Sequence, residues 1–217
     1  MLNIVLADCD LELVPDELAG HPVVRSYSKK RGKQTKKILL DDNYHHQAIR
    51  KRFPHSDEEL RRGRPDIVHF NMVYILDSVA NKEGKVRLYI HTRNGNVITV
   101  NPQLRIPRSF PRFVGVMEKL LVEGVIKSDQ GEVLLEMEKK MKLADLLSRL
   151  GSDKVVGLSP KGERLDLGGL LQGDVSVVVG GFSKGDFLSK FAPDVWISVH
   201  DEELTSWAVV AEVMKHV

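Results

Sequence analysis

The sequence contains a single cysteine, Cys9, among 217 residues. One thiol excludes an internal disulfide and a zinc site built on cysteines. No apolar run approaches the roughly 18 residues that a membrane-spanning helix requires. The opening MLNIVLADCD also lacks the basic leader of a signal peptide. We therefore expect a soluble, cytoplasmic protein without a membrane partner.

Acidic residues are absent from residues 85–112, which carry six Lys and Arg. The net charge of +2 conceals this asymmetry. Residues 21–65 carry thirteen Lys and Arg against five acids, whereas residues 113–217 carry twelve against seventeen. Local basic fields of this kind suit a phosphate backbone. Charge alone leaves two alternatives open: the basic segments bind nucleic acid, or they are solvated loops without such a partner, as many basic loops are.

Three arginines stand three and four residues apart in the acid-free stretch NPQLRIPRSFPRFVG, at Arg105, Arg108 and Arg112. If this stretch were helical, the spacing would place all three side chains on one face. Three cations on one face repel one another unless an anion lies opposite. A solvated helix face is the more common outcome, so spacing alone does not decide between the two.

Strands alternate with helices along much of the chain, which is typical of an α/β fold with a parallel sheet. The length and the ordinary composition, 42% hydrophobic and 29% charged, fit one large domain. A hairpin is expected around Arg93-Asn94-Gly95-Asn96, and a mobile basic loop over residues 29–37. The expected strands are residues 1–8, 131–138, 174–180 and 194–200, with a strand and loop over 154–162 and a strand running into a helix or turn over 66–84. The expected helices are residues 41–53, 56–63, 112–124, 142–150 and 201–217, the last with three acids in its first turn. Asp41 or Asp42 would stand at the amino end of the first helix and Ser56 would cap the second, and the apolar residues of 112–124 recur at helical spacing.

Three loops follow strands in the C-terminal half, at residues 156–160, 180–186 and 197–200. Ligands of parallel sheets bind at such carboxyl ends. The segment GGFSKGDF is neither GxGxxG nor a Walker loop. An uncharged adenosine moiety held by backbone groups between apolar walls would fit these loops better than a phosphate, although the glycines could serve only as turns.

Arg64-Pro65-Asp66 forms a second candidate constellation. The two charged residues could simply pair with each other, or Asp66 could orient Arg64 toward a ligand carbonyl or a developing anion. The histidines offer less. His45 and His46 are adjacent and no third ligand follows at metal spacing, so we expect no metal site. His69 alternates within an apolar run and is expected in the core or facing the hairpin.

Six blocks in fixed order carry a family resemblance: RPDIVHF, LDS..NK.G, LRIPRSFPRFVGVMEKLL, GLSPKGE, GGFSKGDF and ISVH...LTSWAVV. They resemble the archaeal and eukaryotic ribosome-biogenesis enzymes that methylate N1 of a pseudouridine. This is the nucleolar essential protein family of the SPOUT superfamily. The resemblance covers essentially the whole chain and is closer to the archaeal branch. One departure is Ser183-Lys184, where the family commonly has Pro-His.

The resemblance implies an α/β SPOUT methyltransferase domain over residues 1–217, with a mostly parallel sheet and a C-terminal trefoil knot. Residues 85–112 would form a family-specific basic hairpin and arginine insertion, and about 150–217 the knotted cofactor-binding part. S-adenosylmethionine would be the cofactor. Its binding residues would be Leu158, Gly180, Gly181, Gly185, Ile197, Ser198, Val199 and Leu204.

The same resemblance implies a substrate in a small-subunit ribosomal RNA hairpin loop, a homodimer, and ribosomal assembly proteins as further partners. RNA-contacting arginines would be Arg64, Arg105, Arg108 and Arg112, with Arg64 and Asp66 nearest the chemistry. Asp66 would orient Arg64 or accept the N1 proton; we favour the orienting role, because a carboxylate paired to arginine is a poor base.

Two rival functions remain. One is a SPOUT methyltransferase that acts on another RNA nucleotide, such as a position in transfer RNA. The other is a ribosome-assembly RNA chaperone whose methyltransferase activity is secondary. The identity of the methylated nucleoside separates the first from the pseudouridine enzyme, and a methylation-deficient variant that still supports 30S assembly would favour the second.

Overall fold

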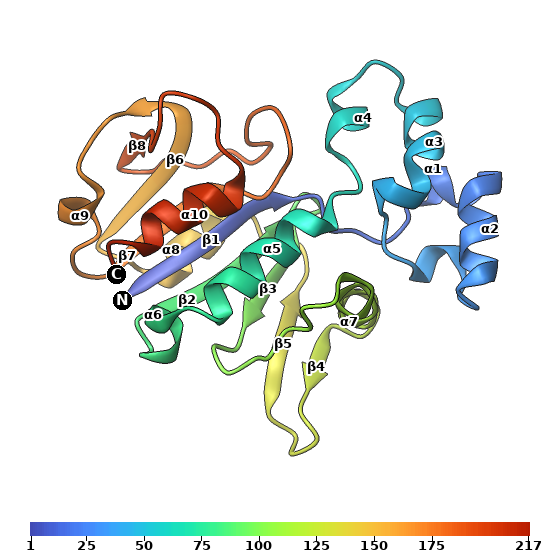
Figure 1. Cartoon of the computed structure of the whole chain (residues 1–217), viewed down its shortest axis with the longest axis horizontal. Helices are drawn as coiled ribbons and strands as arrows, with labels where there is room; N and C mark the ends of the chain where they lie inside the picture. The colour runs from blue at the N-terminus through green and yellow to red at the C-terminus, as the bar shows by residue number, and fades with distance from the viewer.

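The first strand, β1 (Leu2–Cys9), lies in the middle of the sheet, and all eight of its residues are buried. The computed structural model describes residues 1–217. Its eight-stranded sheet has the order β4-β5-β3-β2-β1-β7-β6-β8 (Figure 1). The pairings from β2 through β1, β7 and β6 to β8 are parallel, and those among β2, β3, β5 and β4 are antiparallel. The other strands are β2 (Val86–Thr92), β3 (Val97–Val100), β4 (Val125–Lys127), β5 (Val133–Glu138), β6 (Lys154–Glu163), β7 (Val175–Gly180) and β8 (Val195–Ile197).

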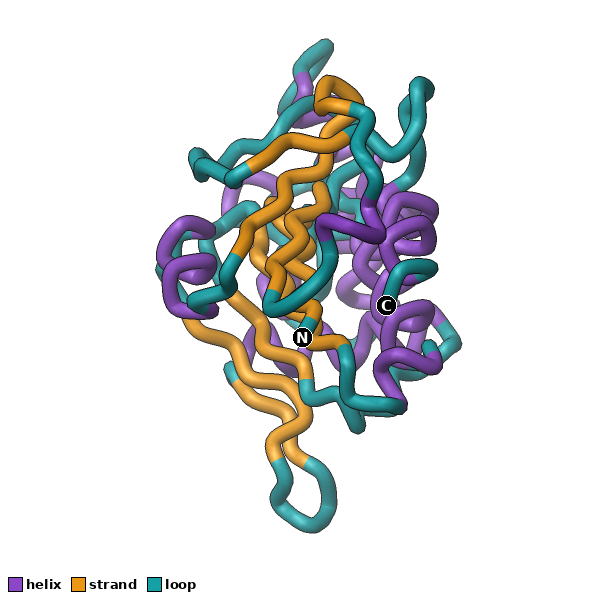
Figure 2. Tube along the Cα trace, turned by 90° about the vertical axis from the view of Figure 1, so that its left-hand side faces the viewer, coloured by secondary structure: helices purple, strands orange, loops and turns teal.

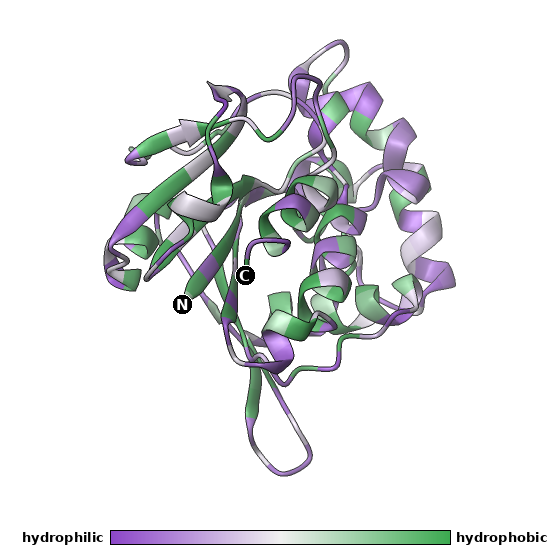
Figure 3. Cartoon of the chain, turned by 60° about the vertical axis from the view of Figure 1, so that its left-hand side comes forward, coloured by the Kyte–Doolittle hydropathy of each residue, from purple (hydrophilic) through white to green (hydrophobic).

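Helices cover both faces of this sheet, as the alternation of side chains in a buried strand requires. Leu2, Ile4 and Leu6 of β1 belong to one core, together with apolar residues of α5, α7 and α10. Val5 and Ala7 belong to the opposite core, with residues of α8. Figure 3 shows the strands largely hydrophobic. The helices are α1 (Asp16–Ala19), α2 (Pro22–Lys30), α3 (Asp42–Arg52), α4 (Asp57–Arg61), α5 (Pro65–Leu76), α6 (Val79–Lys82), α7 (Phe110–Glu123), α8 (Leu143–Leu150), α9 (Leu167–Leu170) and α10 (Ser206–Met214).

The helices α1 to α4 form a separate group beyond the carboxyl end of β1, with a small core of their own (Figure 1). Two of these helices begin at capping residues where the sequence indicates: at the start of α3 Asp41 accepts a hydrogen bond from the Asn43 amide, and at the start of α4 Ser56 accepts one from the Glu59 amide. The basic loop expected over residues 29–37 is confirmed only at residues 31–34, which lie outside any helix or strand. Lys29 and Lys30 end α2, and residues 35–37 form a 3-10 turn.

The predicted hairpin is confirmed: β2 and β3 pair antiparallel around a turn in which Gly95 has φ +70°. The strand expected after Asp66 is wrong. Residues 65–76 form α5, with Pro65 in its first turn, and residues 79–82 form α6. Helix α5 reads as apolar on nearly every side because it packs against β1, α7 and α10 at once.

The C-terminal half follows the predicted alternation with three corrections. A short strand, β4, precedes β5, so the two form an additional hairpin that projects from the sheet (Figure 2). The loop expected at residues 156–160 is wrong, because these residues belong to β6, which continues through Glu163 and shifts its register on β8 between Leu158 and Glu163. The acids at 201–203 precede α10, whose N-cap is Thr205. No helix in the structure is both long enough and apolar enough to span a bilayer.

Candidate functional site

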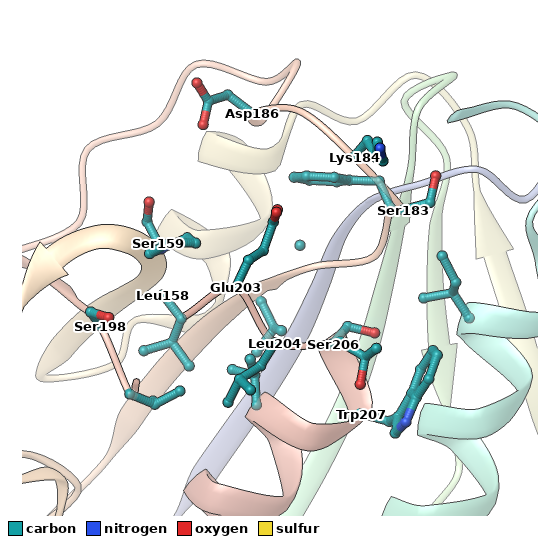
Figure 4. A pocket seen from close by; sticks show the side chains of 18 of the residues that line it. Leu158, Ser159, Ser183, Lys184, Asp186, Ser198, Glu203, Leu204, Ser206 and Trp207 are labelled. Atoms are coloured by element: carbon teal, nitrogen blue, oxygen red, sulfur yellow. The ribbon is translucent and has the colours of Figure 1, made fainter. Parts of the chain in front are cut away.

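A cavity of about 330 Å³ opens where β7 and β8 end and β6 passes its register shift. Most of its wall comes from residues within three stretches of the C-terminal part, 158–160, 179–187 and 197–209, and Arg64 and Ile67 add to it from the start of α5. Figure 4 shows Leu158 and Ser198 on one side, Ser183 and Lys184 on another, and Trp207 on α10. The volume lies at the lower end of the range for small-molecule sites.

Seven of the eight residues expected to bind a cofactor line this cavity. Leucine, isoleucine and valine side chains contribute apolar wall, and the glycines contribute backbone. Ser198 is fixed on both sides, because its amide donates to the Glu163 carbonyl at 2.9 Å and its hydroxyl donates to the His200 carbonyl at 2.6 Å. The seven are Leu158, Gly180, Gly185, Ile197, Ser198, Val199 and Leu204.

Gly181 does not line the cavity. Its amide donates to the Ala7 carbonyl at 2.7 Å, and a Cβ at this position would collide with the Cys9 Sγ. The glycine is therefore required where the loop after β7 passes over the end of β1. Burial raises the pKa of the Cys9 thiol well above its usual range, which keeps it protonated and inert there.

Asp8 anchors the far end of the same loop. It adopts a positive φ of 53° and is almost fully buried. Its Oδ2 accepts hydrogen bonds from the amides of Leu188 and Ser189, at 2.7 and 2.9 Å, and its Oδ1 accepts from the Ser189 hydroxyl at 2.6 Å. Burial alone would raise the pKa of this carboxyl, but the nearby His91 imidazole and the hydrogen bonds from Ser189 lower it overall. Asp8 is thus held ionised as an acceptor.

Several lining residues were missed from the sequence. Ile67 comes from α5, and Thr205, Ser206 and Trp207 come from the start of α10. The Asn71 side chain donates to the Ser206 hydroxyl at 2.7 Å and joins the two helices. A local signal existed, because Thr205 directly precedes an apolar run, as an N-cap does. Nothing in the sequence indicated that this helix start faces the three loops.

Arg64 lines the cavity, whereas Asp66 does not. Arg64 stands at the N-cap of α5 and donates from Nε and Nη2 to the two carboxylate oxygens of Asp66, at 2.9 and 2.8 Å. Both side chains are partly exposed, at 35% and 24%. The hydrogen bonds to Asp66 raise the pKa of the Arg64 guanidinium, which stays charged. The pair therefore places a fixed cation at the cavity wall.

Arg105, Arg108 and Arg112 are exposed and lie outside the cavity. They do not share one helix, because Arg105 and Arg108 precede α7 and Arg112 belongs to its first turn. The irregular segment is nevertheless pinned. The His69 Nε2 donates to the Pro107 carbonyl at 2.7 Å, and the Asn81 side chain donates to the Pro102 carbonyl at 2.9 Å.

A solved structure with a bound ligand has the same fold as this chain. The chain is similar to the crystal structure of Archaeoglobus fulgidus Nep1 bound to S-adenosylhomocysteine, with a TM-score of 0.85 and 36% sequence identity. The match covers 99% of this chain and 95% of that one. The fold is thus that of the SPOUT methyltransferases, with a mostly parallel sheet. The trefoil knot stays a prediction.

The sequence comparisons specify the family. The EMG1/NEP1 methyltransferase family model matches residues 4–217. The ribosomal RNA small subunit methyltransferase Nep1 of Thermococcus onnurineus is 44% identical over 99% of this chain and 96% of its own length. Its counterpart in Methanothrix thermoacetophila is 41% identical over 99% and 94%. The chain belongs to the EMG1/NEP1 methyltransferase family.

Proposed function

We propose that the protein transfers the methyl group of S-adenosylmethionine to N1 of a pseudouridine in a hairpin loop of small-subunit (16S) ribosomal RNA, and so contributes to 30S biogenesis. Family membership supports methyl transfer, and the names of the relatives support a small-subunit ribosomal RNA substrate. The observation that carries the proposal is the paired arginine in the wall of a cavity built from three loops.

The cavity fits the adenosine part of the donor. Its loops offer apolar side chains, free backbone groups and no dedicated phosphate cradle, and the Archaeoglobus relative was crystallised with the demethylated form of the same donor. The residues that would hold it are the seven that line the cavity, with Gly181 shaping the loop from behind. The donor supplies an electrophilic methyl group on a sulfonium centre.

The part of Arg64 follows from the acceptor's chemistry. N1 of pseudouridine must lose its proton, to solvent water, before it can accept a methyl group, and the negative charge left behind spreads onto the ring carbonyls. A guanidinium held near those oxygens stabilises that charge. Asp66 keeps the guanidinium in place through two hydrogen bonds, which occupy both of its carboxylate oxygens. The proposal therefore gives Asp66 the orienting role.

The exposed arginines complete the proposal. Arg105, Arg108 and Arg112 would grip the RNA backbone, with residues 85–112 as the RNA-facing insertion and about 150–217 as a knotted donor-binding part. We further propose a homodimer that meets ribosomal assembly proteins in the cytoplasm. A target base in a single-stranded loop can leave its stack at lower cost than one in a duplex.

The test is donor-dependent methylation of a short RNA hairpin, prepared with either a pseudouridine or a uridine at one loop position. Mass spectrometry of the digested nucleosides should find N1-methylpseudouridine only with the first hairpin. Methylation of both hairpins, or of another nucleotide, would contradict the assignment. A transfer RNA with its own pseudouridines serves as the competing substrate.

A further inference from the structure

Arg61, at the end of α4, contacts the loop after β7 although 125 residues separate it from Asp186. Its Nη1 donates to the Asp186 carbonyl at 2.7 Å, and its Cζ lies 4.2 Å from the centroid of the Phe182 ring. Beside it, the Ser183 hydroxyl donates to the Leu60 carbonyl at 2.8 Å. Three contacts therefore tie the end of α4 to residues 182–186, which line the cavity.

Helix α4 is itself fastened to the sheet. Arg93, in the turn between β2 and β3, donates to both carboxylate oxygens of Glu58 at 2.7 and 2.6 Å. Arg62 donates from Nε and Nη2 to the two carboxylate oxygens of Glu12, both at 2.8 Å. A helix held by two charged pairs offers a firm base from which Arg61 can hold the loop.

The buried guanidinium of Arg61 destabilises the fold more than an apolar side chain in the same place would. The residue is 2% exposed, and its Nε and Nη2 have no hydrogen-bond partner. The nearest carboxylate oxygen, Oδ2 of Asp10, stands 3.8 Å from Nε and has no hydrogen-bond partner of its own, while the Oδ1 of Asp10 accepts from Arg93. Buried N–H groups without partners destabilise a fold, and an apolar side chain would avoid that cost. Arg61 gives the buried Asp10 a nearby positive charge, but its hydrogen bond goes to the loop, at the Asp186 carbonyl.

We propose that Arg61 is a positioning residue for the donor cavity, which fixes the loop at residues 182–186 through the Asp186 carbonyl and the Phe182 ring. This inference rests on the proposed donor site. Without Arg61 the loop loses its contacts at Phe182 and Asp186, while Asp8 still anchors residues 188–189. The segment between can then shift, and the donor loses its preformed wall. Arg61 does not line the cavity, so it acts through the loop.

The experiment measures the dissociation constant of S-adenosylmethionine by isothermal titration for the wild type, Arg61→Lys and Arg61→Met. Methionine keeps the buried stem without the donor groups, and lysine keeps the charge without the planar fork. We expect binding at least about tenfold weaker for Arg61→Met and an intermediate loss for Arg61→Lys. Turnover at saturating donor should stay within about twofold of wild type, so that KM for the donor rises and kcat does not. Arg50→Met, on exposed α3, is the matched control and should bind like wild type.

Unchanged donor affinity in a folded Arg61→Met variant would overturn the inference. If that variant does not fold, Arg61→Lys and Ser183→Ala decide instead. The Ser183 hydroxyl is engaged with Leu60, so its removal should weaken donor binding by about two- to fivefold, as loss of one neutral hydrogen bond does. Wild-type affinity in both would again overturn it. Failure of the wild type to bind the donor contradicts the proposed function itself.

Discussion

Arg64 and Asp66 face each other across Pro65 and share two hydrogen bonds of 2.9 and 2.8 Å at the start of α5. Proline fixes the backbone between them, since its φ suits the first turn of a helix. Two parallel N–H···O bonds set the plane of the guanidinium as well as its position. The Nη1 of Arg64 has no hydrogen-bond partner within the chain, and in the proposed mechanism it is the group that faces the target base.

Asp66→Asn tests the orienting role. An asparagine can accept only one of the two hydrogen bonds from Arg64, and its NH₂ group faces a donor. The guanidinium should then lose its fixed plane, and methylation should fall by about ten- to a hundredfold, because small misplacements of a catalytic group are costly. RNA and donor affinities should stay near wild type in the same preparations. Undiminished turnover would remove Asp66 from the mechanism.

Replacing Arg105, Arg108 or Arg112 with alanine should weaken RNA binding and lower the slope of log K against log salt by about one unit each. Arg108 should show the smallest loss of affinity, since its Nη2 is already paired with Asp77 at 2.8 Å. The measurement is a fluorescence-anisotropy titration of the hairpin at several salt concentrations. Lys119→Ala, on the exposed side of α7, is the control with an unchanged slope. Unchanged slopes in all three variants would show that these arginines are solvated side chains that do not contact the RNA backbone.

His45 makes the stability of the α1–α4 group depend on pH. It is fully buried, its Nδ1 accepts from the Asp41 amide at 3.0 Å, and its Nε2 has no partner. Burial lowers the pKa of this imidazole from 6.5 to about 4. The unfolded chain therefore binds more protons between these values, so stability present above pH 6.5 is lost as the pH falls toward 4.

The size of this effect follows from the shift. At about 1.4 kcal/mol for each pKa unit, a drop from 6.5 to about 4 corresponds to at most roughly 3 kcal/mol. Urea unfolding of wild type and His45→Gln between pH 4.5 and 7 measures it. The free energy of unfolding should fall more steeply with acid in wild type than in the variant. Parallel curves would show that His45 does not titrate differently on folding.

Local chemistry was readable from the sequence. The Asn94-Gly95 turn, the Asp41 and Ser56 caps and the apolar face of α7 each act within a few residues, and each is found where predicted. Helix α5 was mistaken for a strand because its apolar residues lie on nearly all sides, so no helical period stood out. Its packing against three elements explains that pattern, and those contacts are set by the tertiary fold.

In the candidate site, too, some residues could be predicted from the sequence and others only from the tertiary fold. Strand-end glycines indicated the loops, and the family resemblance specified seven residues that do line the cavity. What the sequence could not predict is long-range: that Trp207 and Ile67 complete the wall, and that Gly181 faces Cys9. Arg61 was one arginine among thirteen basic residues between 21 and 65, and only the fold distinguishes it.

The most direct test of the account is the single-turnover rate of Arg64→Ala on a pseudouridine hairpin, at saturating donor and RNA. We expect the rate of Arg64→Ala to be at least about a hundredfold lower than that of the wild type, as for removal of one group that stabilises developing negative charge, and donor affinity to be unchanged. Arg64→Lys should recover part of the rate, since it restores charge without the paired fork. An Arg64→Ala variant that methylates at the wild-type rate would contradict the central claim.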